Sequence, residues 1–241
     1  MNIYLMIKNT FRNKRFIFFT ILTPVFWYIA LVMMSKTSGF YKTKHAYIWF
    51  TVSCLIGIAG NSLVSFAKSI NSMKNFYELQ IATSKYTILK WLYDEIIVQL
   101  VLNTIICLVI LIVMFLIGHV EFSLKFVLLI IILNILGCYL SLFGFTLGQF
   151  FNARAIDASS FLTMLVISFL IVPFYAWVKS DWVSILANVQ RVFPGYYVNQ
   201  LTQHLFLGGE LLNPAICFIF SIILTSIPEI IALLWKFKIK S

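Results

Sequence analysis

The residues of this 241-residue chain that could carry out chemistry are few and widely separated. Its cysteines fall in four different apolar stretches, and neither they nor the histidines have the spacing of a disulfide framework or a metal site. These residues are Cys54, Cys107, Cys138, Cys217, His45, His119 and His204. The phosphate-binding G-x-x-x-x-G-K-[ST] pattern and the H-E-x-x-H and G-x-S-x-G patterns do not occur. We therefore expect no metal, no bound cofactor and no enzyme activity in this chain.

Glu229 is the acidic residue that lies clearly inside an apolar stretch. An ionisable residue within a membrane is a functional candidate by default. Proton relays normally use several such groups, and Lys236 follows less than two helical turns later. The simpler interpretation is that the side chain of Glu229 extends toward the membrane surface. A transport role is the alternative.

Six apolar stretches, each long enough to cross a bilayer, occupy most of the chain. A transmembrane helix needs about 20 mostly apolar residues. The composition agrees, with 61% hydrophobic and 11% charged residues and a mean hydropathy of +0.97. We predict an all-α membrane protein with six transmembrane helices in a single domain over residues 1–241. The predicted spans are 16–35, 46–67, 96–118, 126–150, 157–178 and 213–235.

The net charge of +10 is distributed unevenly between the two sides of these spans. Twelve Lys and Arg residues flank the spans on the side of the two termini, and six lie on the other side. Cytoplasmic loops carry the excess of Lys and Arg, so both termini are expected in the cytoplasm, with the chain in the cell (inner or cytoplasmic) membrane. The positive charge then sets topology and contacts anionic lipid of the bilayer, and nucleic acid is not an expected partner.

Three segments outside the spans carry amphipathic patterns. Residues 1–15 alternate Ile3, Ile7 and Phe11 with basic residues, which favours an interfacial helix over a plain charge cluster. Residues 68–95 mix charged and apolar side chains and predict a cytoplasmic segment with a short helix, with Asp94 and Glu95 opening the third span and Trp91 at the membrane surface. Residues 179–212 predict two short helices that re-enter the outer leaflet.

Small residues recur in two of the spans. Gly137, Ser141, Gly144 and Gly148 form a stripe at helical spacing that predicts a close helix contact, either within one chain or between two. The second span carries Ser53, Gly57, Gly60 and Asn61. Packing and the lining of a transport path are both open interpretations of that run.

Four weak motifs follow one another in a recognisable order. The basic segment FRNKRFIFFTILTP leads into a span with Pro24, and Pro173 lies near the end of the fifth span. NFYELQIATS covers 75–84, and FPGYYVNQLTQHLFLGG covers 193–209 with Pro194, Gly208 and Gly209. Together these segments resemble the membrane subunits of ATP-binding-cassette (ABC) exporters of the type-2 permease family. Residues 75–84 are similar to that family's glutamate-leucine-leucine-x-x-threonine-proline segment, although Ser84 replaces the proline.

The resemblance implies a permease that works as a homodimer or paired with a related permease. A separate cytoplasmic nucleotide-binding ATPase subunit would bind ATP and Mg, because this chain lacks the motifs for it. Residues of the segment 72–83 would make the contact that couples the two subunits. These are Met73, Asn75, Phe76, Tyr77, Glu78, Leu79 and Thr83.

The residues that could line a substrate path are small or weakly polar: Ser53, Gly57, Asn61, Ser160 and Thr163. This character favours export of a hydrophobic or amphipathic peptide, toxin or drug. Export of a polysaccharide, a teichoic-acid-type polymer or a lipid is the alternative within transport. A membrane assembly or sensor subunit that transports nothing is the alternative of another class.

Overall fold

The computed structural model describes residues 7, 8, 10, 12, 17–37, 46–118, 123–173 and 180–238, and every regular element in these ranges is a helix. Six of the helical stretches are long and apolar enough to cross a membrane. The predicted all-α membrane protein with six spans is therefore confirmed. The predicted interfacial helix 1–15 falls mostly outside the described residues. The α-helices are α3 (Thr23–Thr37), α4 (Ala46–Gly60), α5 (Phe66–Thr83), α6 (Ile88–Gly118), α7 (Leu124–Phe150), α8 (Ala153–Ile171), α9 (Asp181–Gln190), α10 (Pro194–Leu207) and α11 (Leu212–Lys238).

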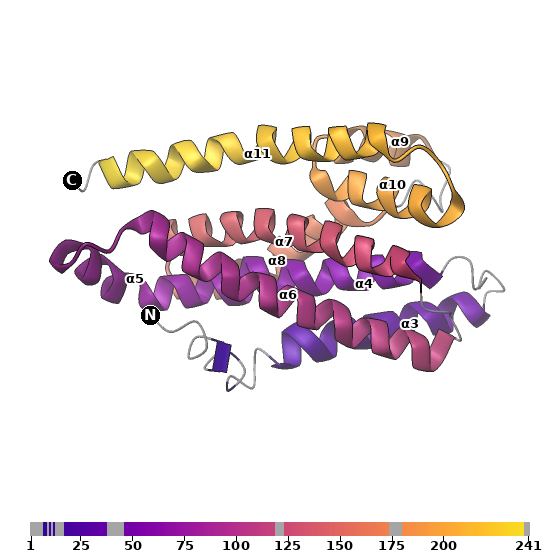
Figure 1. Cartoon of the computed structure of the whole chain (residues 1–241), viewed down its shortest axis with the longest axis horizontal. Coiled ribbons are helices and arrows are strands. Elements are labelled where there is room, and N and C mark those ends of the chain that lie inside the picture. The colour runs from indigo at the N-terminus through magenta and orange to yellow at the C-terminus, as the bar shows by residue number, and fades with distance from the viewer. Residues whose placement is uncertain are drawn as a thin grey trace.

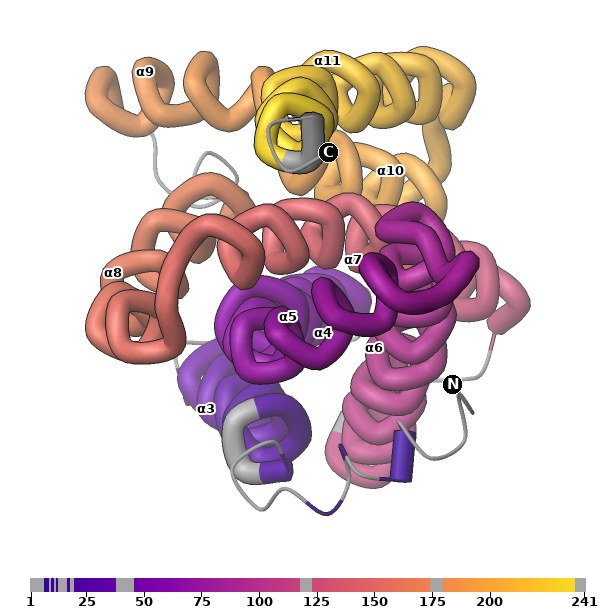
Figure 2. The backbone as a smooth tube through the Cα atoms, turned by 90° about the vertical axis from the view of Figure 1, so that its left-hand side faces the viewer, coloured from indigo at the N-terminus to yellow at the C-terminus, as the bar shows by residue number. Residues whose placement is uncertain are grey.

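The long helices run side by side along the longest axis of the molecule (Figure 1). Seen end on, α11 lies with α9 and α10 on one side, and α7 forms the next layer with α8 at its edge (Figure 2). The helices α4 and α5 lie at the centre, between this layer and α3 and α6 on the other side. The helix that contains α4 is the most buried of the six spans and α8 is the least buried. The second span is thus the centre of the bundle, and α8 lies at its margin.

The second membrane helix does not end where its apolar stretch ends. A π-helical turn, Asn61–Ser65, joins α4 to α5, so that the helix continues from Ala46 to Thr83 over 38 residues. At 1.5 Å per residue this helix is about 57 Å long, nearly twice the thickness of a bilayer core. The predicted 68–95 segment is therefore a hairpin of two helix ends. Because α6 already begins at Ile88, Asp94 and Glu95 lie in its second turn and do not open it.

Proline and glycine mark three helix ends, and the sequence predicts the two that belong to α10. The predicted fifth span runs to residue 178, whereas α8 ends at Ile171. Pro173 follows the end of α8, Pro194 is the first residue of α10, and Gly208 ends α10 with a φ of 89°. The two short helices of residues 179–212 are thus present, and their depth in a membrane stays a prediction. Pro24 is the second residue of α3, directly after a π-helical turn at Phe18–Leu22, so its missing N–H falls at a break in the α-helical pattern.

The small-residue stripe of α7 packs within this chain. A Cβ on Gly144 would collide with the carbonyl oxygen of Ser62, and one on Gly148 would collide with that of Ala67. Between Gly137 and Gly144 along α7, the hydroxyl of Ser141 lies 3.2 Å from the hydroxyl of Ser62. The backbones of α7 and of the second membrane helix therefore approach as closely as glycine allows.

Replacing Gly144 by alanine should destabilise the fold by about 1–3 kcal/mol, because the new methyl group meets a backbone oxygen that cannot move freely. Gly60→Ala is the matched control, since its Cβ would meet nothing closer than the flexible end of Met164 at 3.5 Å. Thermal unfolding in detergent, followed by circular dichroism, compares the two variants. Equal unfolding temperatures would contradict the close contact.

Candidate functional site

The hairpin of α5 and α6 extends past α7 and α8 at the end of the bundle where the C-terminus lies (Figure 1). Its interior is a stack of aromatic rings. The rings of Tyr77 and Trp91 stack at 4.2 Å between centroids, and Trp91 meets Phe145 of α7 edge-on at 5.0 Å. Trp91 is fully buried among the helices, and its predicted level at the membrane surface stays a prediction.

Polar contacts lock the turn of the hairpin. The hydroxyl of Ser84 donates to the carbonyl of Gln80 at 2.6 Å and accepts from the backbone N–H of Tyr86 at 3.1 Å. The Tyr86 hydroxyl donates to Asp94 at 2.7 Å. Burial and this hydrogen bond raise the pKa of Tyr86 above its usual value, so the hydroxyl keeps its proton and remains a donor. Ser84 is the residue that follows the last residue of α5, and its side chain thus fixes the end of that helix.

The outward face of α5 is apolar at its centre. The side chains of Phe76 and Leu79 are 60% and 66% exposed, and Asn75 and Thr83 are exposed beside them. Met73 and Glu78 are half-buried at the edges of this face. Tyr77 is 1% exposed and belongs to the interior of the hairpin, although the sequence groups it with the contact residues. We call the exposed side chains of Asn75, Phe76, Leu79 and Thr83 the hairpin face.

The base of the hairpin is tied to the end of α7. Asn71 donates to the carbonyl of Phe151 at 2.7 Å, and Lys74 donates to that of Gln149 at 2.9 Å. Lys236 of α11 also donates to the Gln149 carbonyl. The last carbonyls of a helix lack partners within it and carry partial negative charge, which is why lysine suits this position. Three helices therefore meet at the carboxyl end of α7.

Ser53, Gly57 and Asn61 lie inside the bundle. Gly57 packs against Pro24 of α3 and Ile106 of α6. The side-chain amide of Asn61 donates to Gln99 at 2.7 Å and to Asn103 at 3.1 Å. In the described part of the chain these residues are packed by neighbouring helices, and the structure does not bring them to one surface with Ser160 and Thr163.

A buried polar stripe on α6 is a feature that the sequence motifs do not predict. Glu95, Gln99 and Asn103 follow one another at intervals of four residues, and all three are buried. Glu95 accepts a hydrogen bond from Trp91 at 3.3 Å, while the two amides meet Asn61. The four-residue spacing is present in the sequence, but the predicted third span begins at residue 96 and so excludes Glu95.

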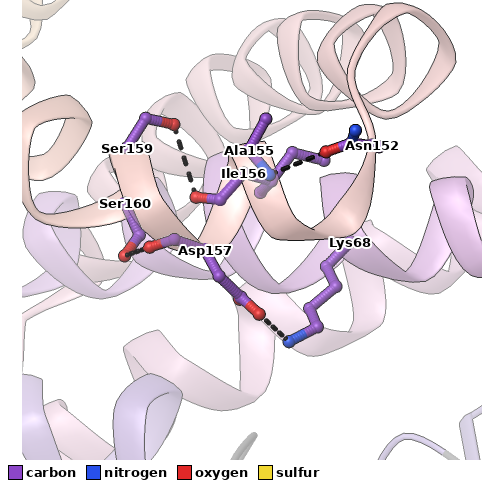
Figure 3. Close-up of polar contacts among 7 residues, drawn as sticks. All are labelled: Lys68, Asn152, Ala155, Ile156, Asp157, Ser159 and Ser160. Carbon is purple, nitrogen blue, oxygen red and sulfur yellow. Dashed lines mark hydrogen bonds and ion pairs between the residues drawn. The ribbon is translucent and has the colours of Figure 1, made fainter.

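Ser160 and Thr163 line a cavity of about 190 Å³ between α8, α7 and the second membrane helix. The other lining residues are mostly apolar: Leu63, Val64, Leu147, Phe151, Ile156 and Ser159. Figure 3 shows the first turns of α8, with Ser159 and Ser160. The hydroxyl of Ser160 donates to the carbonyl of Asp157 at 2.7 Å, and that of Ser159 donates to the carbonyl of Ile156 at 3.4 Å. The cavity is therefore apolar in character, because these hydroxyls hydrogen-bond to their own helix.

The start of α8 is fixed by two contacts that Figure 3 also shows. Asn152 accepts a hydrogen bond from the backbone N–H of Ala155 at 2.8 Å, and Asp157 forms an ion pair with Lys68 of α5 at 2.5 Å. Both partners of the ion pair are partly exposed, so it contributes about 1 kcal/mol or less. It joins α8 to the second membrane helix beside the cavity.

Comparisons with protein-family models, with curated proteins and with solved structures found no match. A function for this chain therefore rests on its sequence motifs and on two features of the structure. These are the hairpin face and the cavity beside α8.

Tyr77 and Phe76 are neighbours in sequence but have opposite surroundings, and this allows a paired test. Tyr77→Ala should cost about 3–5 kcal/mol because it empties the centre of the aromatic stack. Phe76→Ala should change stability by less than about 0.5 kcal/mol, since its ring is exposed. Thermal unfolding of both variants in detergent measures the difference. A large loss in Phe76→Ala would mean that the hairpin face is covered by this chain itself.

Proposed function

We propose that this chain is the membrane-spanning permease subunit of an ATP-driven ABC exporter of the type-2 permease family. The resemblance of its motifs supports this assignment, as do the six membrane-spanning helices with a helical hairpin at one end. The sequence carries no phosphate-binding motif, so ATP and Mg would bind a separate cytoplasmic ATPase subunit. The chain itself would not be an enzyme.

The observation that carries the proposal is the hairpin face on a rigid support. Two large apolar side chains, Phe76 and Leu79, are exposed next to polar residues at the end of a long helix. Their opposite side is held by the stack of Tyr77 on Trp91 and by the ties at the end of α7. An apolar centre with a polar rim is typical of a protein interface. A contact that transmits movement needs such support, because a flexible segment would absorb the movement.

The continuous helix from Ala46 to Thr83 gives the route by which the movement would reach the membrane. The ATPase would bind the hairpin face in the cytoplasm and would hold the hairpin differently before and after ATP binding. Because the hairpin and the centre of the bundle share one helix, displacement of the hairpin would act on the spans packed around α4. Differential binding to two such states is how a partner shifts a conformational equilibrium.

We propose that the substrate is a hydrophobic or amphipathic peptide, toxin or drug. The apolar cavity lined by Ser160 and Thr163 supports this class, because it offers no charged side chain among its lining residues. The cavity lies beside α8, which is the least buried span of the chain. In a homodimer, or in a pair with a related permease, α8 could face the shared path. Both termini would be cytoplasmic in the cell membrane.

Changing Phe76 and Leu79 together to serine should weaken binding of the ATPase by about 30-fold or more. Loss of a central apolar contact costs about 2 kcal/mol of binding free energy, which corresponds to this change in affinity. Leu116→Ser, at an equally exposed position near the far end of α6, is the control. Affinity is measured between the purified ATPase and the permease in nanodiscs, and all variants are checked for insertion. Unchanged affinity and ATPase stimulation in the double variant would contradict the proposed contact.

Thr163→Trp should reduce transport and substrate-stimulated ATP hydrolysis by filling the cavity. Leu162→Trp is the control, since Leu162 is exposed on α8 and does not line the cavity. ATP hydrolysis by the reconstituted complex is measured with a panel of amphipathic peptides and hydrophobic dyes. If both variants respond like the parent complex, the cavity is not part of the substrate path.

A further inference from the structure

Glu229 is buried in the described part of the bundle without a hydrogen-bond partner. Its side chain is 7% exposed, and neither carboxyl oxygen meets a donor among the described residues. The simpler interpretation of the sequence, in which this side chain extends to the membrane surface, is therefore wrong. It faces the interior from a helix whose opposite side, with Ile230 and Leu234, is exposed.

The other polar groups on this face of α11 already have partners. Ser221 donates to the carbonyl of Val192 at 2.8 Å, and Thr225 donates to the carbonyl of Ser221 at 2.7 Å. Glu229, one turn further on, continues this stripe without such a bond. In the seam, which is the contact between α7 and α11, the hydroxyl of Tyr139 on α7 lies near Thr225 and Glu229. Tyr139 also lacks a hydrogen bond of good geometry among the described residues.

The basic groups at this end of the seam are engaged elsewhere. Lys236 on the same helix and Lys74 on α5 both donate to the carbonyl of Gln149. The titratable groups of α10 lie toward the start of α11. There Tyr196 and Tyr197 interact with Arg191 and Cys217, and the His204 ring bonds to the carbonyl of Glu210. The nearby acids of α6, Asp94 and Glu95, are bonded to Tyr86 and Trp91. Among the described residues, Glu229 has no counter-ion.

We propose that Glu229 is a proton-binding site in the seam between α7 and α11. A carboxylate that is removed from water and has neither a counter-ion nor a donor is unfavourable, whereas the protonated carboxyl is neutral. In the packed seam one carboxyl oxygen holds the proton as an O–H group. The proton leaves to water when α11 separates from α7 and the carboxylate is solvated.

The surroundings suit a proton better than a larger ligand. Glu229 does not line the cavity beside α8, and a proton needs no space. A protonated carboxyl needs one acceptor for its O–H. Pro228 has no N–H, so the carbonyl of Leu224 lacks the donor that residue 228 would otherwise supply within α11. This site goes beyond the proposed export function and does not depend on an ATPase partner.

The test is labelling of the full chain in lipid nanodiscs with dicyclohexylcarbodiimide, which reacts with protonated carboxyls in apolar surroundings. Peptide mass spectrometry locates the label and separates Glu229 from Glu95. We expect label on Glu229 near neutral pH, none in Glu229→Gln, and loss of about tenfold for each pH unit above the pKa of the site. A water-soluble carbodiimide should instead favour the exposed Glu210.

Two results would overturn the proposal. One is the absence of label on Glu229 across the pH range, and the other is protection of Glu229 by sodium ions, which would indicate a metal cation in place of the proton. Stability gives a second measurement. Glu229→Gln should unfold at the temperature of the parent chain because glutamine is neutral and of similar shape, whereas Glu229→Lys should unfold at a lower temperature. A clear loss of stability in Glu229→Gln would show that the negative charge itself is required.

Discussion

The close approach of α7 to the second membrane helix is the contact on which the rest of this structure depends. Gly144 and Gly148 allow the carbonyls of Ser62 and Ala67 to come nearer than any side chain would permit. In lipid there is no strong hydrophobic force between helices, so such packing must hold the bundle together. Further along the same pair of helices, Asn71 and Lys74 bind the last carbonyls of α7. One helix pair thus combines close packing in the membrane with a polar anchor at its end.

That pair determines how the hairpin is presented. Because α5 continues α4 without a break, the orientation of the hairpin follows from the packing of the central span. The aromatic stack beneath Phe76 and Leu79 then keeps the hairpin from bending on its own. A force applied to the hairpin face would reach the membrane core rather than be absorbed by a flexible loop. This mechanical continuity makes the proposed role as a permease driven by an external ATPase physically reasonable.

The number of spans and the two short helices before α11 could be predicted from the sequence, because apolar length and the Pro194 and Gly208 breaks are local signals. The length of the second helix could not, since residues 68–83 are amphipathic and are held helical by packing on α7. The buried stack of Trp91 on Tyr77 could not be predicted either, because an aromatic ring suits a membrane surface as well as a protein interior. Sequence also left open which chain the glycine stripe of α7 contacts. The burial of Glu229 required knowing which face of α11 meets the bundle.

The most direct test of the central claim is native mass spectrometry of the tagged chain, extracted from its native host in mild detergent. The account predicts a complex of two permease copies, or one copy with a related permease, together with two subunits that bind and hydrolyse ATP. A chain that is recovered without a nucleotide-binding partner in several detergents would contradict the exporter assignment. It would favour a membrane assembly or sensor subunit that transports nothing.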